Sequence, residues 1–294
     1  MVGKSSISRR IFVLCNYLFL GAFTFVCITP LIHVLSSSVS DPYRLSRNLG
    51  VIYWPLGFTV QGYKIVSANP HVINGFLNTV FYVVVATAIN LTLTSMGAYV
   101  CSRKGFAFSR FVIFMITFTM FFNGGLVPFY LLVRALGMAD TRWAMLIPPA
   151  ISAFNLIIMR TSFAELPDSL EESARMDGAN DFTILFRIIL PVSKAVVAVI
   201  ILLYAVGHWN SWFNAMIFLR DRKLYPLSLV LREILILNDV QRVMILADPD
   251  NALNIYRPLV QYCIIIISIV PIMCIYPFIQ KHFTKGIMIG SIKG

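Results

Sequence analysis

Six long stretches without a formal charge limit what this chain can fold into. All 24 Lys and Arg residues and all 13 Asp and Glu residues lie outside them. The stretches cover about residues 11–35, 76–100, 111–133, 143–159, 195–219 and 258–280. A helix of roughly 20 apolar residues crosses a hydrocarbon core about 30 Å thick. The sequence therefore predicts an all-α integral membrane protein with six transmembrane helices.

The composition favours a membrane protein over a soluble one. Charged residues make up 13% of the chain, against about 25% in a soluble domain. The first stretch is much longer than the roughly 7–15 residues of a signal-peptide core, so we expect it to be retained as a span. The net charge of +11 is spread over the connecting segments, which argues against nucleic-acid binding. The five cysteines show no CxxC spacing, so no metal site is predicted.

Basic residues in short connections indicate the orientation, because they resist translocation. If the N-terminus is cytoplasmic, more Lys and Arg residues lie on the cytoplasmic side than in the first two connections on the outer side. The inside set is Lys4, Arg9, Arg10, Arg103, Lys104, Arg110, Lys281, Lys285 and Lys293, and the outside set is Arg44, Arg47, Lys64, Arg134 and Arg142. We therefore expect the N- and C-termini to be cytoplasmic.

The connection between the fourth and fifth stretches is acidic. Within it, Asp168 is predicted to cap a short helix over residues 169–177, with Glu171 completing a capping box. Gly178 then stands where a left-handed C-terminal cap is needed, and Asp181 offers an N-cap for a second helix. Because such a short helix is not stable alone, we expect it to dock on a partner.

The same connection carries a known signature. It contains Glu172-Ser173-Ala174, then Gly178, then Ile188, Leu190 and Pro191. This spacing resembles the EAA signature of permease subunits of bacterial ABC importers, with Ser173 in place of the first alanine. Asp177-Gly178-Ala179 adds similarity to sugar permeases. Along most of its length the chain resembles the MalG-like branch of binding-protein-dependent carbohydrate permeases.

The resemblance implies one transmembrane domain over residues 1–294, with a coupling loop at about residues 165–191. In the family, the helix of this loop is the coupling helix, which sits in a cleft of a separate ATPase and transmits its motion. The residues assigned to ATPase coupling in this way are Glu171, Glu172, Ser173, Ala174, Asp177, Gly178, Ala179, Leu190 and Pro191. The alternative is that Glu171 only caps the helix and Gly178 only ends it.

Three further segments narrow the implied cargo. Residues 123–128, 155–160 and 207–212 resemble the permeases that serve oligosaccharides of complex or acidic polysaccharides. We therefore expect a sugar importer for oligosaccharides, with acidic ones such as alginate or aldouronate fragments among the candidates. Expected partners are a second homologous permease, two ATPase subunits, an extracytoplasmic solute-binding protein, the sugar and membrane lipid, without nucleic acid. The expected location is the bacterial cytoplasmic (inner) membrane, as a multi-pass protein.

The chain lacks a sequence for using ATP itself. Its only Gly-Lys pair, Gly3-Lys4, has no glycine-rich turn before it, so no phosphate-binding loop is expected. We expect no cofactor and no catalytic residue in this chain, which is therefore not an enzyme, with ATP and Mg bound by the partner ATPase. The alternative function is an ion-coupled secondary transporter acting without an ATPase. Such a carrier usually has an ionisable group within a span, where His208 is the only mid-sequence candidate.

The fifth stretch offers candidates for a substrate pathway. Trp209, Asn210, Trp212 and Asn214 combine flat aromatic faces for sugar rings with amides for hydroxyl groups. Alternatively, the tryptophans belong to the interfacial aromatic belt and the asparagines join helices by hydrogen bonds. The sequence leaves both interpretations open.

Overall fold

The computed structural model describes residues 7–103, 105, 107–236 and 253–291, with the side chains of the last helix at residues 255–275. The regular structure of these residues is helical, apart from one isolated bridge between Ser40 and Phe58. The chain divides into two compact units. Unit 1 comprises Met1–Asn69 and Glu233–Ile269, and unit 2 comprises Pro70–Arg232 and Val270–Gly294. Three basic residues used to predict the orientation lie outside the described residues, namely Lys4, Lys104 and Lys293.

Unit 1 joins the end of the first helix to the last helix. It contains α1 (Ile7–Ser38), α2 (Pro42–Arg47), α3 (Gln61–Ser67) and the first part of α16 (Leu253–Ser291). The Sγ atom of Cys263 donates to the Ser38 carbonyl over 3.3 Å. A Cβ at Gly62 would lie 2.6 Å from the same Sγ atom, so this close approach of α3 requires a glycine. The contact with Ser38 lies at the C-terminal end of α1, where the buried residues of this helix are found.

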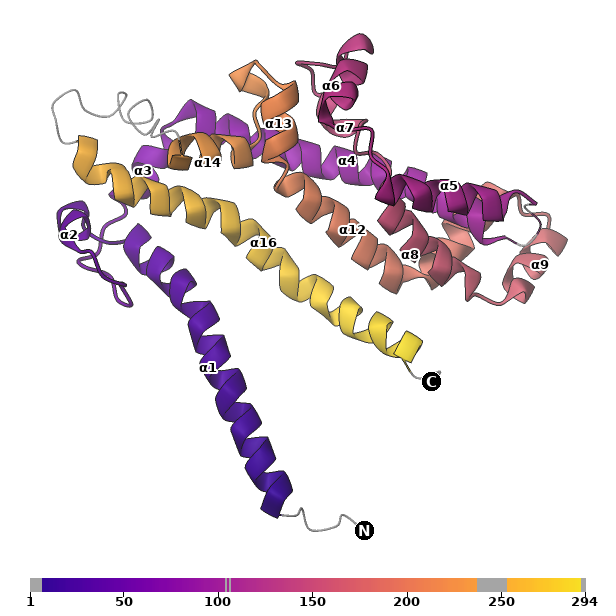
Figure 1. Cartoon of the computed structure of the whole chain (residues 1–294), viewed down its shortest axis with the longest axis horizontal. Helices are drawn as coiled ribbons and strands as arrows, with labels where there is room; N and C mark the ends of the chain where they lie inside the picture. The colour runs from indigo at the N-terminus through magenta and orange to yellow at the C-terminus, as the bar shows by residue number, and fades with distance from the viewer. Residues whose placement is uncertain (1–6, 104, 106, 237–252, 292–294) are drawn as a thin grey trace. The chain divides into compact units, whose positions relative to one another are not determined.

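Unit 2 is built on α4 (Pro70–Ser102), which packs along α8 and α12 (Figure 1). Its other elements are α5 (Ser109–Phe121), α6 (Leu126–Ala135), α7 (Trp143–Leu146), α8 (Ala153–Ala164), α9 (Asp168–Met176), α10 (Asp181–Thr183), the π-helix η1 (Ile184–Ile189), α11 (Leu190–Val192), α12 (Lys194–Trp209), α13 (Trp212–Phe218), the 3-10 helix η2 (Arg222–Leu224) and most of α14 (Leu227–Ile236). Buried positions of α4 recur every four residues, at Asn78, Tyr82, Ala86, Asn90, Thr94 and Ala98. At this spacing successive residues are neighbours about 40° apart, so they form a buried stripe that winds slowly around α4. Its small and polar residues allow close helix contacts.

Three of the six charge-free stretches lie in single long helices. In the described residues, α1, α4 and the segment Ile255–Ile275 of α16 are each long and apolar enough to cross a membrane. They account for the stretches at 11–35 and 76–100 and for most of the stretch at 258–280.

The other three stretches are interrupted. α5 and α6 meet at an angle of 115°, where Gly125 has a left-handed φ of 88°. Residues 147–152, which include Pro148 and Pro149, separate α7 from α8. Asn210 and Ser211 separate α12 from α13. A left-handed glycine and prolines without an N–H group both stop a helix.

These breaks change how the spans are counted. By helix length, the described residues contain three candidate spans, or up to five if each of two bent helix pairs forms one span. The second pair joins Asp181–Val192 to α12 at an angle of 91°. At membrane depth, backbone freed by a break is tolerated only where it is buried in protein or lines a cavity. The breaks therefore point to the place where a functional site is expected.

Candidate functional site: an acidic loop and a polar cavity in unit 2

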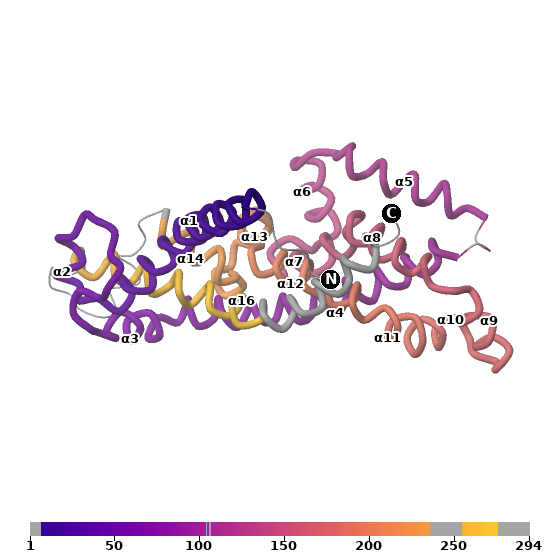
Figure 2. Tube along the Cα trace, turned by 90° about the horizontal axis from the view of Figure 1, so that it is seen from below, coloured from indigo at the N-terminus to yellow at the C-terminus, as the bar shows by residue number. Residues whose placement is uncertain are grey.

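The acidic loop folds as helix, turn and helix, as its sequence predicts. α9 and α10 lie at the same end of unit 2 (Figure 2), and Gly178 between them has a left-handed φ of 80°. The Gly178 N–H donates to the Arg175 carbonyl and the Ala179 N–H donates to the Ala174 carbonyl, each over 3.0 Å. This pair of bonds defines a Schellman cap. The predicted left-handed cap at Gly178 is confirmed.

Both predicted N-caps are wrong. Pro167 occupies the N-cap position of α9 without a side-chain hydrogen bond, and Asp168 is already helical. In the second helix the cap is Asn180, whose Oδ1 accepts a backbone N–H over 2.8 Å. The carboxylates of Glu171 and Asp181 instead accept charge-assisted hydrogen bonds from arginine, which are stronger than bonds from a neutral backbone donor.

Glu171 anchors α9 to the end of α4. Its Oε2 lies 2.8 Å from Nη1 of Arg103, and these side chains are only 12% and 15% exposed. Its Oε1 accepts hydrogen bonds from the Tyr99 hydroxyl over 3.1 Å and from Nη2 of Arg175 over 2.8 Å. Arg175 also donates to Asp181 over 2.6 Å. One series of charged groups therefore joins α4, α9 and α10.

The two faces of α9 differ in exposure. Among the residues assigned to ATPase coupling, Glu171 and Ala174 are buried, Ala179 and Leu190 are half-buried, and Glu172, Ser173, Asp177, Gly178 and Pro191 are exposed. Ala174 packs in a core cluster with Tyr99 and Ile184. On the exposed side, Met176 is 88% exposed and Phe182 is 60% exposed. Exposed apolar side chains among acidic ones are typical of a docking surface.

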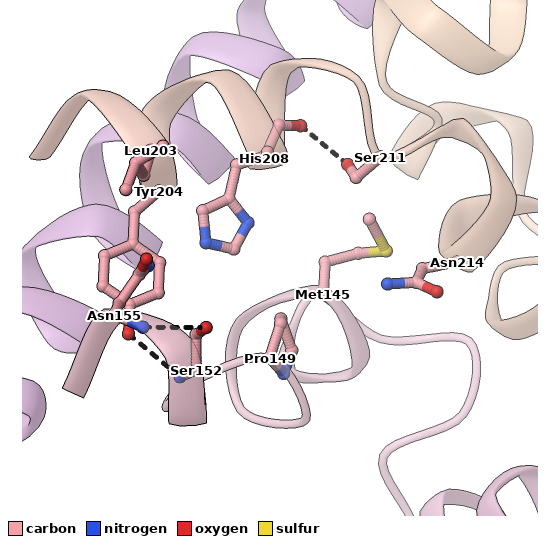
Figure 3. Close-up of a pocket in the computed structure, with 10 residues that line it drawn as sticks. Met145, Pro149, Ser152, Asn155, Leu203, Tyr204, His208, Ser211 and Asn214 are labelled. Atoms are coloured by element: carbon pink, nitrogen blue, oxygen red, sulfur yellow. Dashed lines mark hydrogen bonds between the residues drawn. The ribbon is translucent and has the colours of Figure 1, made fainter. Parts of the chain in front are cut away.

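The second candidate site is a cavity of about 380 Å³ in unit 2 (Figure 3). It is lined by Met145, Pro149, Ser152, Asn155, Leu203, Tyr204, Gly207, His208, Ser211 and Asn214. The breaks at residues 147–152 and 210–211 both contribute to this lining, which matches the rule that irregular backbone in a membrane lines a cavity. None of the lining residues carries a formal charge. The cavity therefore offers neutral hydrogen-bonding groups that suit hydroxyls.

Some polar groups of the cavity are already paired within the protein. The Tyr204 hydroxyl accepts the Ser152 N–H over 3.0 Å and lies 2.7 Å from Oγ1 of Thr94. The side-chain amides of Asn155 and Asn214, by contrast, make no hydrogen bond with another described residue. Each amide supplies donors and an acceptor, so these two residues are available to bind a ligand.

His208 is held from a neighbouring helix. The residue is 6% exposed, and its Nε2 lies 2.8 Å from Nδ2 of Asn90 in α4. Asn90 also donates to the Pro149 carbonyl over 3.2 Å. One buried asparagine thus links α4, the break after α7, and α12.

Of the four residues predicted for a substrate pathway, only Asn214 lines this cavity. Nδ2 of Asn210 donates over 3.0 Å to the carbonyl of Val206 in the preceding helix α12. Trp209 packs edge-on against an aromatic ring of α4, at 6.2 Å between centroids. Trp212 lies under the guanidinium of Arg232, 4.8 Å from the ring centroid. The assignment of these four residues to a pathway remains a prediction.

Most of the cavity lining was not predicted from the sequence. Tyr204 and His208 stand four positions apart in a charge-free stretch, which places two polar groups on one helix face and was an available signal. Asn155 lies in another such stretch. The pairing of Arg103 with Glu171 had no local signal, because the two residues are far apart in the chain.

These features define a multi-pass membrane transport protein. They are long apolar helices, broken helices around a neutral polar cavity, and a short helix anchored at one end of unit 2. The chain belongs to the family described as binding-protein-dependent transport system inner membrane component, whose model matches residues 96–287. The predicted family, the predicted inner-membrane location and the prediction that the chain is not an enzyme are therefore confirmed.

The similarity to named relatives extends over nearly the whole chain. Protein LplC of Bacillus subtilis (strain 168) is 38% identical over 287 residues, covering 97% of this chain and 96% of that protein. The polygalacturonan/rhamnogalacturonan transport system permease protein YtcP of the same organism is 36% identical, covering 97% of this chain and 99% of that protein. A chain in the crystal structure of a bacterial ABC transporter involved in the import of the acidic polysaccharide alginate matches with a TM-score of 0.87 and 33% identity, covering 96% of this chain and 100% of that chain.

Proposed function

We propose that this chain is a permease subunit of an ATP-driven importer that carries oligosaccharides of acidic polysaccharides across the bacterial inner membrane. The observation that carries the saccharide part of the proposal is the neutral cavity at the two helix breaks, whose amides suit sugar hydroxyls. The cargo class is supported by the relatives, one named for polygalacturonan and rhamnogalacturonan transport and one for alginate import. We therefore expect oligosaccharides of uronic acids as cargo.

The proposed topology has six spans with both termini in the cytoplasm. The excess of basic residues in the N-terminal tail, the connection after α4 and the C-terminal tail supports this orientation. In this topology α5 with α6, α7 with α8, and α12 with α13 each form one interrupted span. The acidic loop with α9 then faces the cytoplasm.

The proposed complex contains a second homologous permease, two ATPase subunits and an extracytoplasmic solute-binding protein. The exposed face of α9, with Glu172 and Met176, contacts an ATPase subunit that binds ATP and Mg. The buried face passes movement of α9 to α4 through the ion pair between Glu171 and Arg103. Because α4 packs along α8 and α12, which contribute to the cavity, this movement opens the cavity alternately to the two sides.

Uptake into proteoliposomes that hold the complete complex tests this function. We expect trigalacturonate to enter only when ATP reaches the ATPase subunits and the binding protein is on the opposite side. The neutral trisaccharide maltotriose, matched in length, is expected to enter much more slowly. A complex with a hydrolysis-deficient ATPase is the control.

Two results would contradict the proposal in different ways. Trigalacturonate uptake by the chain alone, driven by a proton or sodium gradient, would identify a secondary transporter. ATP-dependent uptake of maltotriose without uptake of trigalacturonate would leave an importer but refute the acidic cargo.

A further inference from the structure

Asn90 joins three elements at the wall of the cavity. The residue is fully buried in α4, at 0% exposure. Its Nδ2 lies 3.2 Å from the carbonyl oxygen of Pro149, in the break between α7 and α8, and 2.8 Å from Nε2 of His208 in α12. One side-chain amide therefore contacts both a helix break and an imidazole that lines the cavity.

These two contacts determine how the hydrogens are shared. A backbone carbonyl only accepts hydrogen bonds, so the amide atom of Asn90 that faces Pro149 is the NH₂ group. The opposite amide orientation would place two oxygens against each other. The same NH₂ group donates its second hydrogen to Nε2 of His208, so Nε2 must be the acceptor of this hydrogen bond. A neutral imidazole that accepts at Nε2 carries its hydrogen on Nδ1.

The Nδ1–H group of His208 remains available to a ligand. The imidazole lines the cavity between Tyr204 and Asn214 (Figure 3), and Nδ1 makes no hydrogen bond within the described part of the chain. The Tyr204 hydroxyl is engaged with Ser152 and Thr94. The side-chain amide of Asn155 can rotate to donate or accept. His208 thus contributes a donor of fixed direction, beside amides that can adapt.

We infer that Asn90 is a positioning residue for cargo recognition, because it fixes His208 in the Nδ1–H tautomer and so directs this donor at a hydroxyl oxygen of the passing sugar. This inference rests on the proposed import of oligosaccharides. Since none of the described side chains that line the cavity is charged, the group recognised there is a neutral oxygen and not a carboxylate, whose burial without a cation would be costly. The ligand class is a sugar hydroxyl, common to acidic and neutral saccharides.

Two substitutions of His208 distinguish the roles of its two ring nitrogens. In His208→Asn the short amide reaches the position of Nδ1, whereas in His208→Gln the longer amide reaches the position of Nε2. We expect His208→Gln to keep the contact with Asn90 but to raise the KM for trigalacturonate uptake about fivefold, the effect of one lost hydrogen bond. His208→Asn is expected to keep a KM closer to that of the wild type. A wild-type KM in His208→Gln would overturn the inference.

A spectroscopic measurement tests the tautomer directly. The complete complex is labelled with ¹⁵N-histidine, and the signals of residue 208 are those lost from the solid-state NMR spectrum of His208→Gln. The wild type is expected to show a protonated Nδ1 and an unprotonated Nε2. In Asn90→Leu we expect a mixture of both tautomers and a raised KM. A wild-type spectrum with the hydrogen on Nε2 would refute the inference.

A matched control separates positioning from simple destabilisation. Asn78 is another buried asparagine of α4, and its Nδ2 donates to the carbonyls of Lys223 and Tyr225 over 2.6 and 3.1 Å. Asn78→Leu therefore also removes two buried hydrogen bonds, and we expect it to lower stability without changing the tautomer of His208 or the KM. An altered tautomer in this control would show that any loss of packing in α4 has the same effect, which would also overturn the inference.

The failure of the inference and the failure of the proposed function are distinguishable. If the wild-type complex transported no saccharide, the proposed function would fail, and the NMR result would still decide the tautomer. If transport were normal and the tautomer were as inferred, but both substitutions of His208 left KM unchanged, only the role in recognition would fail.

Discussion

Glu171 and Glu172 are adjacent in the sequence, yet their surroundings differ. Glu171 is buried and pairs with Arg103 and Arg175, whereas Glu172 is exposed. The hydrogen bond with Glu171, and then the attraction of Asp181, raise the pKa of Arg175 above its ordinary value, so this guanidinium stays charged. At the scale of single residues, the acidic loop thus contains one carboxylate that holds the helix and another that is free to meet a partner.

Replacing each glutamate with glutamine separates these roles. Glu171→Gln leaves the largely buried Arg103 without its counter-charge, and we expect it to destabilise the docking of α9 by about 2 kcal/mol. Glu172→Gln removes an exposed charge and is expected to change stability by less than about 0.5 kcal/mol, but to weaken binding of the ATPase. Hydrogen exchange of α9 and a binding titration measure the two effects. Equal exchange in the two variants would contradict the anchoring role of Glu171.

Asp140 gives a pH-dependent contact outside the predicted spans. It has a left-handed φ of 58°, and its Oδ1 accepts the N–H groups of Arg220 and Asp221 over 2.7 and 2.9 Å. The hydrogen bonds from Asp221 and then from Arg220 lower the pKa of Asp140 below its ordinary value of 3.8. A lowered pKa means that the contact stabilises the fold above pH 3.8 and that this contribution is lost as the pH falls through the folded-state pKa.

Hydrogen exchange of the Arg220 and Asp221 amides checks this dependence. We expect these amides to be protected near neutral pH and to lose protection as the pH falls below 3.8. In Asp140→Asn the side-chain oxygen still accepts hydrogen bonds but does not titrate. The protection of the Arg220 and Asp221 amides in this variant should therefore be weaker and independent of pH in this range. The same acid-induced loss in both proteins would mean that another group is responsible.

At the scale of elements, short irregular segments determine where the helices end. The breaks at residues 147–152 and 210–211 free backbone groups, and both breaks lie at the cavity. The end of α9 depends on Gly178, whose left-handed conformation closes the Schellman cap. In the described part of the chain, no atom lies within 4 Å of the position that a Cβ would take at Gly178, apart from its own neighbours. A side chain there would therefore strain the backbone without a clash inside the chain.

Two substitutions of Gly178 test the importance of this turn. Gly178→Ala is expected to cost about 1 kcal/mol, because a left-handed conformation is unfavourable for alanine, and to lower the sugar transported per ATP hydrolysed in an assembled complex. Gly178→Asn is the control, because asparagine tolerates this conformation better. Proteoliposome uptake and phosphate release, measured together, give the ratio. Unchanged uptake per ATP in Gly178→Ala would count against a coupling role for the turn.

At the scale of the whole molecule, the proposed topology predicts which side each loop occupies. Single cysteines replace Glu172 and Arg220, both exposed, in a background without the exposed Cys15, Cys27 and Cys274. In intact cells, we expect a membrane-impermeant maleimide to label position 220 and to label position 172 only after permeabilisation. Labelling of position 172 in intact cells would reverse the proposed orientation.

The sequence alone determined the class of protein and the form of its acidic loop. Charge-free stretches indicate a membrane protein because burying charge in lipid is costly. The helix that ends at Gly178 is a local pattern, readable from neighbouring residues. The N-caps of α9 and α10 were predicted wrongly. Glu171 and Asp181, which were expected to take part in the caps, accept hydrogen bonds from arginine instead.

Only the tertiary structure decided where these helices form a site. Asn90 meets Pro149 and His208 across 59 and 118 positions of the chain, and Tyr99 meets Glu171 across 72. No local pattern specifies such pairs, because they depend on how α4, α8 and α12 pack. The absence of charge in the six stretches likewise did not locate their breaks, although Pro148 and Pro149 are residues that stop a helix. An uncharged segment has the same composition whether its helix crosses the membrane unbroken or opens to line a cavity.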